Sequence, residues 1–98
     1  MKMLITLDRD KILSEGVYHF ADMYVCVDEV FRRRGVNVAW DGEQRIYEDL
    51  GEHALSNFLI CMDILEHTEW FMDNVSRWFL ITSTTTEDIL AEIRKSEG

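Results

Sequence analysis

Three features of this 98-residue sequence predict a mainly α-helical fold. Apolar side chains recur every three or four residues along much of the chain, proline is absent, and the glycines stand singly rather than in linkers. Such spacing places apolar side chains along one side of an amphipathic helix. Hydrophobic residues make up 47% of the sequence, which is enough to build a packed core. We therefore expect a single domain, residues 1–98, folded as a compact bundle of three to five helices.

The first helix is expected at about residues 9–34, after Asp8 as its N-cap. Its apolar stripe consists of Leu13, Val17, Phe20, Tyr24, Val27 and Phe31. Gly16 lies within this stretch and is expected to weaken the helix by only about 1 kcal/mol relative to alanine. Three consecutive arginines followed by Gly35 indicate the C-terminal end, where cations and glycine are favoured.

A central helix is expected after the short extended segment 36–40. The stretch 41–44, DGEQ, resembles a capping box and would begin this helix. Gly51 is expected to divide it into two pieces, near residues 43–50 and 52–67. Its apolar stripe consists of Ile46, Leu50, Ala54, Phe58, Met62 and Leu65.

Two shorter helices are expected in the last third of the chain. Thr68 would cap one of them, whose apolar side is formed by Phe71, Val75, Trp78 and Phe79. Thr85 and Asp88 would form a capping box for the last helix, which carries Ile89, Leu90 and Ile93.

An α+β fold is the alternative. Residues 3–7 and 77–82 are rich in β-branched and aromatic side chains, which favour strands. In this reading they pair in a small sheet that also includes residues 36–40.

The charge of the chain is concentrated in its middle third. The net charge is −9, and residues 41–73 hold nine acidic side chains against the single base Arg45, a net charge of −8. So acidic a protein should not bind nucleic acid directly, because both are polyanions. The asymmetry instead predicts a basic protein partner.

Two blocks of similar sequence, DLGEH at residues 49–53 and DILEH at 63–67, contain the residue types that bind metals. On one continuous helix they would lie about 21 Å apart at 1.5 Å per residue. Ligands of a single ion lie within roughly 2–2.6 Å of it. We therefore interpret the blocks as the solvated side of a helix and expect no metal site. A metal-dependent enzyme remains a disfavoured alternative.

No other pattern in the sequence predicts catalysis or a cofactor. His19 has no serine or cysteine nucleophile placed near it by sequence, and no glycine-rich loop is present to hold a phosphate. Cys26 and Cys61 stand in apolar runs, so we expect both to be buried, reduced thiols. No signal peptide or membrane-spanning stretch is found in the sequence, so we expect a cytoplasmic protein that does not bind membranes.

In size, acidity and lack of a recognised motif, the chain resembles the small acidic inhibitors made by phages and mobile elements, anti-CRISPR proteins among them. Some of those inhibitors occupy the nucleic-acid channel of a defence nuclease. The resemblance implies a non-catalytic protein whose carboxylates take the place of phosphates in a basic groove of a host protein. The candidate partner-binding residues are Glu48, Asp49, Glu52, Asp63, Glu66 and Glu69, with Trp70 as an apolar anchor. The alternative function is a homo-oligomeric helical structural or adaptor module.

Overall fold

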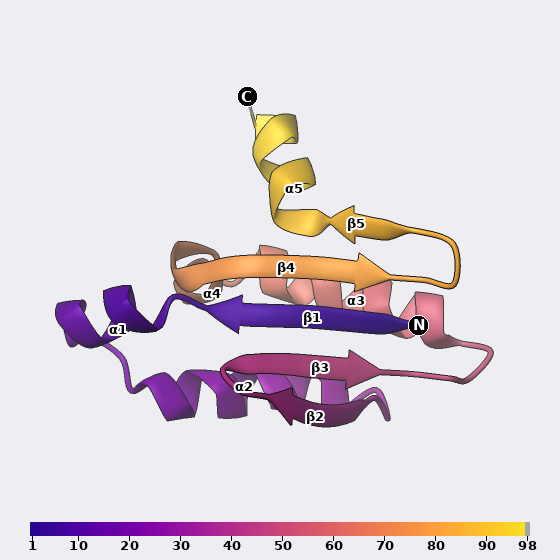
Figure 1. Cartoon of the computed structure of the whole chain (residues 1–98), viewed down its shortest axis with the longest axis horizontal. Coiled ribbons are helices and arrows are strands. Elements are labelled where there is room, and N and C mark those ends of the chain that lie inside the picture. The colour runs from indigo at the N-terminus through magenta and orange to yellow at the C-terminus, as the bar shows by residue number, and fades with distance from the viewer. Residues whose placement is uncertain (98) are drawn as a thin grey trace.

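The computed structural model is α+β, with a five-stranded antiparallel sheet that carries helices on one face (Figure 1). It describes residues 1–97, and the side chains of residues 1–96. The strands are β1 (Lys2–Leu7), β2 (Asn37–Asp41), β3 (Gln44–Glu48), β4 (Val75–Ile81) and β5 (Thr86–Asp88), in the order β2-β3-β1-β4-β5. The helices are α1 (Arg9–Glu15), α2 (Phe20–Arg32), α3 (Ala54–Glu66), α4 (Glu69–Asn74) and α5 (Ile89–Glu97).

The prediction of a mainly α-helical bundle is therefore wrong. Helices make up 49% of the chain and strands 27%. The alternative α+β reading is closer, because residues 3–7, 36–40 and 77–82 coincide largely with β1, β2 and β4. β1 and β4 do pair with each other, whereas β2 pairs with β3, a strand that this reading did not include.

The helix expected at residues 43–50 is replaced by a β-hairpin. β2 and β3 pair with Asp41 opposite Gln44, which leaves Gly42 and Glu43 as a two-residue turn. Gly42 has φ of +65°, as the first turn residue of a type II′ hairpin requires. The stretch that resembled a capping box is therefore a hairpin turn, and alternate residues of β3 point to opposite faces of the sheet.

The helix expected at residues 9–34 is two helices. Asp8 caps α1 as expected, because its carboxylate accepts a hydrogen bond from the Lys11 amide at 3.1 Å. Gly16 then takes the left-handed conformation, with φ of +66°, and ends the helix. Gly16 is therefore a terminator rather than a weak interruption. α2 ends at Arg32, shortly before Gly35, which agrees with the predicted end.

The helix expected after Thr68 is short. α4 ends at Asn74, and the chain continues directly into β4. This strand pairs with β1, where every residue from Lys2 to Ile5 has a partner in β4. Asp88, rather than Thr85, caps α5, since its carboxylate accepts a hydrogen bond from the Ala91 amide at 3.0 Å. Strand pairing over a long sequence distance has overridden the helical periodicity of residues 75–79.

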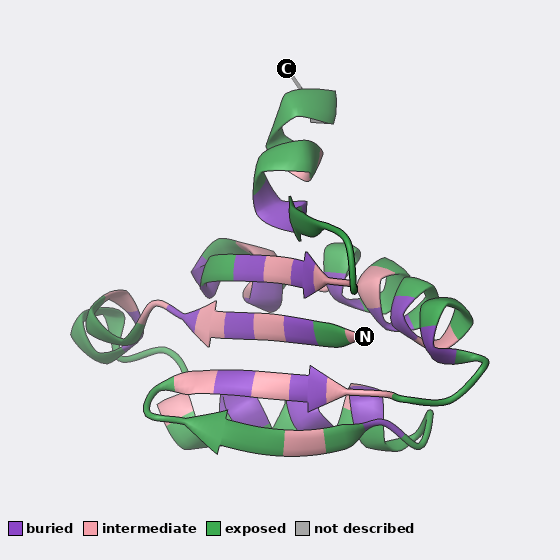
Figure 2. Ribbon diagram, turned by 45° about the vertical axis from the view of Figure 1, so that its right-hand side comes forward, coloured by how far each residue is buried: buried purple, intermediate pink, exposed green. Residues whose placement is uncertain are grey.

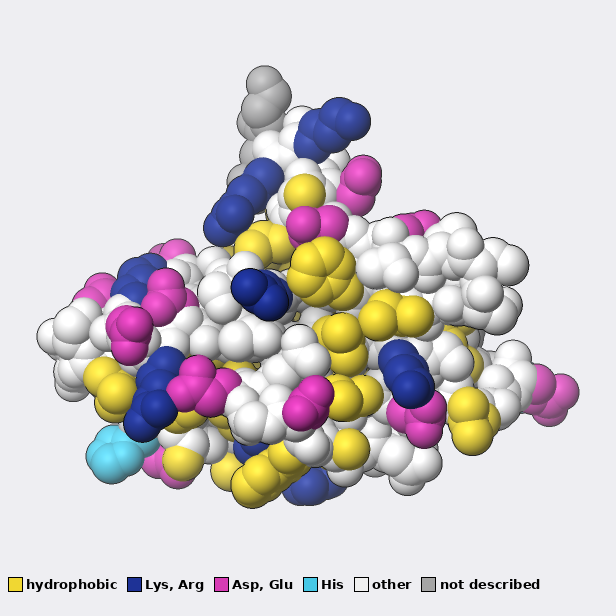
Figure 3. Space-filling view, in the orientation of Figure 1, with side chains coloured by type: hydrophobic (Ala, Val, Ile, Leu, Met, Phe, Trp, Pro, Cys, Tyr) yellow, Lys and Arg dark blue, Asp and Glu magenta, His cyan; other side chains and the backbone are white. Residues whose placement is uncertain are grey.

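The main core lies between the sheet and the helices α2 and α3 (Figure 2). The sheet contributes alternate residues of its central strands, and the helices contribute one side each. Its largest fully buried side chains are Trp78, Tyr47, Phe31, Phe58 and Phe71. The ring of Phe31 stacks on that of Tyr47 at 3.8 Å between centroids. No helix of residues 1–97 covers the opposite face of the sheet, and half-buried apolar side chains gather there (Figure 3).

A charged pair lies inside this core. Asp28 of α2 is 3% exposed, and its carboxylate lies 3.3 Å from Nε of Arg45 on β3. The hydroxyl group of Tyr47 also donates to Asp28, at 2.7 Å. Burial, followed by the neighbouring Asp28 carboxylate, raises the pKa of Tyr47, so its hydroxyl remains a proton donor. The hydrogen bonds that Asp28 accepts from Arg45 and Tyr47 thus join the helix layer to the sheet.

The two cysteines differ in exposure, so the expectation that both are buried is wrong for one of them. Cys61 is buried on α3, and its thiol lies 3.6 Å from the carbonyl oxygen of Val30. Cys26 is exposed on α2. Cys26 and Arg33, seven residues later, are both exposed on the outer side of α2, so Cys26 lies beside the predicted apolar stripe rather than within it.

No helix of the described residues is long and apolar enough to cross a membrane.

Removing the charge of Asp28 should destabilise the protein strongly. Asp28→Asn leaves the buried Arg45 without a counterion, which typically costs about 3–5 kcal/mol. Tyr47→Phe removes one hydrogen bond and should cost about 1–2 kcal/mol. Urea unfolding followed by circular dichroism measures both. Glu29→Gln, on the exposed side of α2, is the control and should change stability by less than about 1 kcal/mol. Equal effects of Asp28→Asn and Glu29→Gln would contradict this account.

The two thiols should react at very different rates. Burial raises the pKa of Cys61 to about 11, so little of it is thiolate at pH 8 and its sulfur is also inaccessible. A disulfide reagent such as DTNB should modify one thiol per chain quickly in the native protein, and the second only after denaturation. Cys26→Ser should remove the fast phase. A fast phase that survives in Cys26→Ser would show that Cys61 is accessible.

Candidate functional site

The residues predicted to bind a partner do not form one row on a helix. Glu48, Asp49 and Glu52 precede α3, whereas Asp63 and Glu66 lie near its C-terminal end. Glu69 and Trp70 follow on α4. The structure therefore divides these residues into two groups at opposite ends of α3.

In the first group, Glu48 and Asp49 already have partners within the chain. Glu48 lies in β3 and pairs with Lys2 at 3.7 Å. The carboxylate of Asp49 accepts hydrogen bonds from the side chain of Asn57 at 2.9 Å and from the amide of Gly51 at 2.8 Å. These hydrogen bonds, that of Asn57 foremost, lower the pKa of Asp49. Asp49 thus ties the loop to the first turns of α3, and this structural role competes with a role in binding.

Glu52 and Asp63 are exposed and each lies beside a histidine. Glu52 lies 3.6 Å from Nε2 of His53, and Asp63 lies 3.5 Å from Nδ1 of His67. The carbonyl oxygen of Asp63 also accepts a hydrogen bond from Nδ1 of His67 at 2.8 Å. This hydrogen bond, together with the Asp63 carboxylate, raises the pKa of His67. Both pairs are open to water, so the attraction within each pair is weak.

Glu66 and Glu69 are exposed, and within the described residues neither forms an ion pair with a lysine or arginine. Glu66 lies at the edge of a groove between α3, the sheet and α5. We call this the acidic groove; it is lined by Met62, Glu66, Trp78, Glu87, Ile89, Glu92, Ile93 and Ser96. Four of the lining residues are apolar, and the three carboxylates have no cationic partner among the described side chains.

Two members of the acidic groove, Glu87 and Glu92, were missed by sequence reasoning. They lie outside the acidic segment 41–73, and sequence alone gives no signal that β5 and α5 return beside the end of α3. Their proximity to Glu66 depends on the pairing of β5 with β4, in which Phe79 lies opposite Asp88.

Trp70 is half-buried rather than a free anchor. Its ring lies 6.4 Å from the rings of both Tyr18 and Phe71, centroid to centroid. Together with Val17, Met23 and Cys26 it lines a shallow pocket between α4 and the start of α2. Trp70 therefore has a packing role, and only part of its ring is open to a partner.

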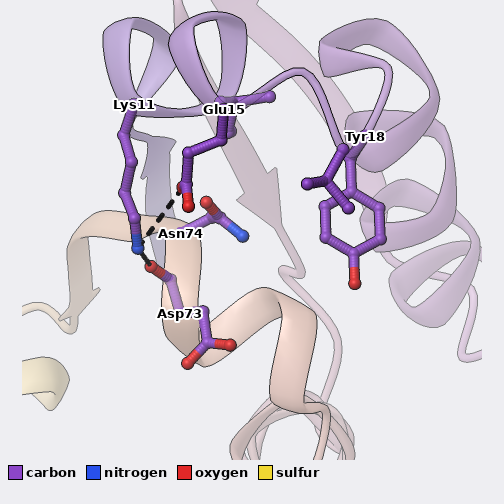
Figure 4. Close-up of a pocket in the computed structure, with 7 residues that line it drawn as sticks. Lys11, Glu15, Tyr18, Asp73 and Asn74 are labelled. Carbon is purple, nitrogen blue, oxygen red and sulfur yellow. Dashed lines mark hydrogen bonds and ion pairs between the residues drawn. The ribbon is translucent and has the colours of Figure 1, made fainter.

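A further pocket lies between α1 and α4, and its charged groups largely satisfy one another (Figure 4). Lys11 extends from α1 toward α4, where its ammonium group donates to the carbonyl oxygen of Asp73. The same ammonium group lies 3.9 Å from the carboxylate of Glu15. The volume of this pocket is about 120 Å³, much smaller than that of the acidic groove, about 310 Å³. The contact of Lys11 with Asp73 links the two short helices α1 and α4, which is a structural role.

The blocks 49–53 and 63–67 do not approach one another as metal ligands. In the part of the chain that the structure describes, no three side chains of His, Cys, Asp or Glu are placed to hold a metal ion. The expectation that the protein needs no metal or cofactor stays a prediction.

The sequence matches no protein-family model, and no curated protein or solved structure is significantly similar to the chain.

Proposed function

We propose that this chain is a non-catalytic, cytoplasmic binding protein of the inhibitor type, which uses carboxylates to occupy a basic groove of a host protein. The anti-CRISPR-like inhibition of a nucleic-acid-binding nuclease is the form of this proposal that the charge favours. The single observation that supports it best is the acidic groove, which Glu66, Glu87 and Glu92 line together with apolar side chains, and where these glutamates lack cationic partners among the described residues.

The chemistry of the acidic groove fits a basic protein segment. The aliphatic stems of lysine and arginine pack on apolar surface while their charged ends reach toward carboxylates. Met62 and Ile93 are half-buried and offer such a surface, and the three glutamates line the same groove. The net charge of −9 adds long-range attraction to a basic partner and accelerates association.

Of the carboxylates predicted from the sequence to contact a partner, those near the C-terminal end of α3 fit this proposal best. Glu66 and Glu69, with the exposed Asp63, lie near the acidic groove's end of α3. Glu52 is exposed at the other end of the helix. We therefore place the main contact around the C-terminal end of α3, with Glu52 as a separate outer contact.

Reversing charges beside the acidic groove should weaken binding more than reversing charges elsewhere. The variant Glu66→Lys, Glu87→Lys, Glu92→Lys places three cations where the proposal requires anions. It should reduce the displacement of labelled duplex DNA from a purified RNA-guided nuclease at least tenfold, as measured by fluorescence anisotropy. It should also flatten the dependence of that displacement on salt.

The matched control is Asp10→Lys, Asp22→Lys, Asp41→Lys, which changes the net charge by the same amount at exposed acids outside the acidic groove. It should change displacement less than about threefold. Equal losses in both variants would show that only net charge matters. If the wild-type protein displaces no DNA, the nuclease form of the proposal is wrong.

A homo-oligomeric module is the second candidate, and the outer side of α3 favours it. Leu55, Leu59, Ile60 and Ile64 are each between 37% and 51% exposed. Successive members are four, one and four residues apart, so at 3.6 residues per turn they spread over the half of the helix that faces away from the core. Ser56 and Asp63 are the polar residues on this half, and exposed aliphatic side chains gathered on one helix often mark an interface.

If this candidate is right, the wild-type protein should dimerise in a concentration-dependent way, and Leu59→Glu should make it monomeric. Light scattering coupled to size-exclusion chromatography measures the mass directly. Leu13→Glu is the matched control, because Leu13 is also exposed but lies on α1. A monomeric wild-type protein at high micromolar concentration would exclude a stable homo-oligomer through α3.

A further inference from the structure

Arg45 is held in an unusual position for an arginine. It lies in β3 with its side chain toward α2, and the residue is only 8% exposed. Its guanidinium group lies between two aromatic rings, 4.3 Å from the centroid of Tyr24 and 4.1 Å from that of Trp40. Stacking on both faces of the guanidinium plane leaves only its edges for hydrogen bonds.

One edge of the guanidinium group is occupied and the other is not. Nε donates to both carboxylate oxygens of Asp28, at 3.3 and 3.4 Å. Within the described residues, the two terminal nitrogens have no hydrogen-bond acceptor. No fully enclosed side-chain nitrogen or oxygen of this part of the chain lacks a partner, so the free terminal nitrogens of Arg45 must reach solvent.

The free edge opens on a cavity of about 290 Å³ between α2 and the β2–β3 turn. The rings of Phe20, Tyr24 and Trp40 contribute to its lining. Arg9 and Glu43 also line it and form an ion pair at 2.7 Å, so their charges balance each other. We call this the Arg45 pocket.

The start of α2 contributes partial positive charge to the Arg45 pocket. Phe20 and Ala21 are the first two residues of this 13-residue helix and both line the cavity. The N-cap residue His19 makes no side-chain hydrogen bond to the helix. The N-terminal end of a helix carries partial positive charge and unpaired amide groups, which favour a nearby anion.

We propose that the Arg45 pocket binds a small monocarboxylate carried on an aromatic or other apolar body. A carboxylate matches the planar edge of a guanidinium group and accepts two hydrogen bonds from it. The aromatic lining suits the apolar body of such a ligand.

The charges around the pocket favour a monoanion over phosphate. Asp28 already balances Arg45, Glu43 balances Arg9, and the chain carries a net charge of −9. A dianion would therefore meet stronger repulsion than a carboxylate. The site is independent of the acidic groove, so the proposal does not rest on inhibition of a nuclease.

Benzoate is the probe, and benzamide is its uncharged counterpart of nearly the same shape. Titration of the ¹⁵N-labelled wild-type protein should move the indole N–H signal of Trp40 in a saturable way with benzoate. Benzamide and inorganic phosphate should each bind at least tenfold more weakly. Trp40→Phe identifies the indole signal. Equal affinity for benzoate and benzamide, or tighter binding of phosphate, would overturn the proposal without any variant of Arg45.

Arg45→Lys tests the role of the guanidinium group, because lysine keeps the charge opposite Asp28 but loses the planar edge. It should weaken benzoate binding at least tenfold. Arg77→Lys is the matched control, since Arg77 is an exposed arginine of β4 outside the pocket, and its affinity should be unchanged. A folded Arg45→Lys variant that binds benzoate as tightly as the wild type would also overturn the proposal. If Arg45→Lys does not fold, the comparison of the wild-type ligands decides.

Discussion

The carboxylate of Asp28, enclosed by the sheet and the helix layer, constrains how the two layers fit together. An unpaired charge in such a place costs several kcal/mol, so the fold must supply partners for it. Arg45 and Tyr47 are alternate residues of β3, and both reach Asp28 only when they face α2. A shift of β3 by one residue would turn both away and present Ile46 to the carboxylate instead. The buried pair therefore selects one strand register, in addition to whatever stability it contributes.

The same register creates the surroundings of Arg45. Because Trp40 lies opposite Arg45 in the β2–β3 pairing, its ring covers the guanidinium group from the edge of the sheet. Tyr24 approaches from α2, and its hydroxyl group accepts from the amide of Leu7 while donating to the carbonyl oxygen of Glu43. A single aromatic side chain thus fastens the helix to β1 and to the hairpin turn. The free edge of the guanidinium group is a consequence of this packing, since Asp28 occupies only the Nε side.

α3 has apolar side chains around much of its circumference. Phe58, Cys61 and Leu65 face the core, whereas an aliphatic row remains on the outer side. The acidic residues that the sequence placed along a helix face instead lie mainly at the two ends of α3. This arrangement gives the helix an apolar middle and acidic ends. The two functions considered for the protein correspond to these parts, since an oligomer would use the middle and a basic partner the C-terminal end with α5.

The sequence by itself determined the uneven charge, the cap at Asp8, the end of α2 before Gly35 and most of α3. These features depend on composition or on neighbours within one helical turn, so local patterns suffice to predict them. Only the tertiary structure decided that residues 44–48 are a strand, because their pattern also suits a helix start and the deciding hydrogen bonds come from β1, some forty residues away. The same holds for the exposure of Cys26 and for the meeting of Glu66 with Glu87 and Glu92. In each case the conformation or exposure of the residue depends on whether a distant element packs against it and which one, and no local pattern carries that information.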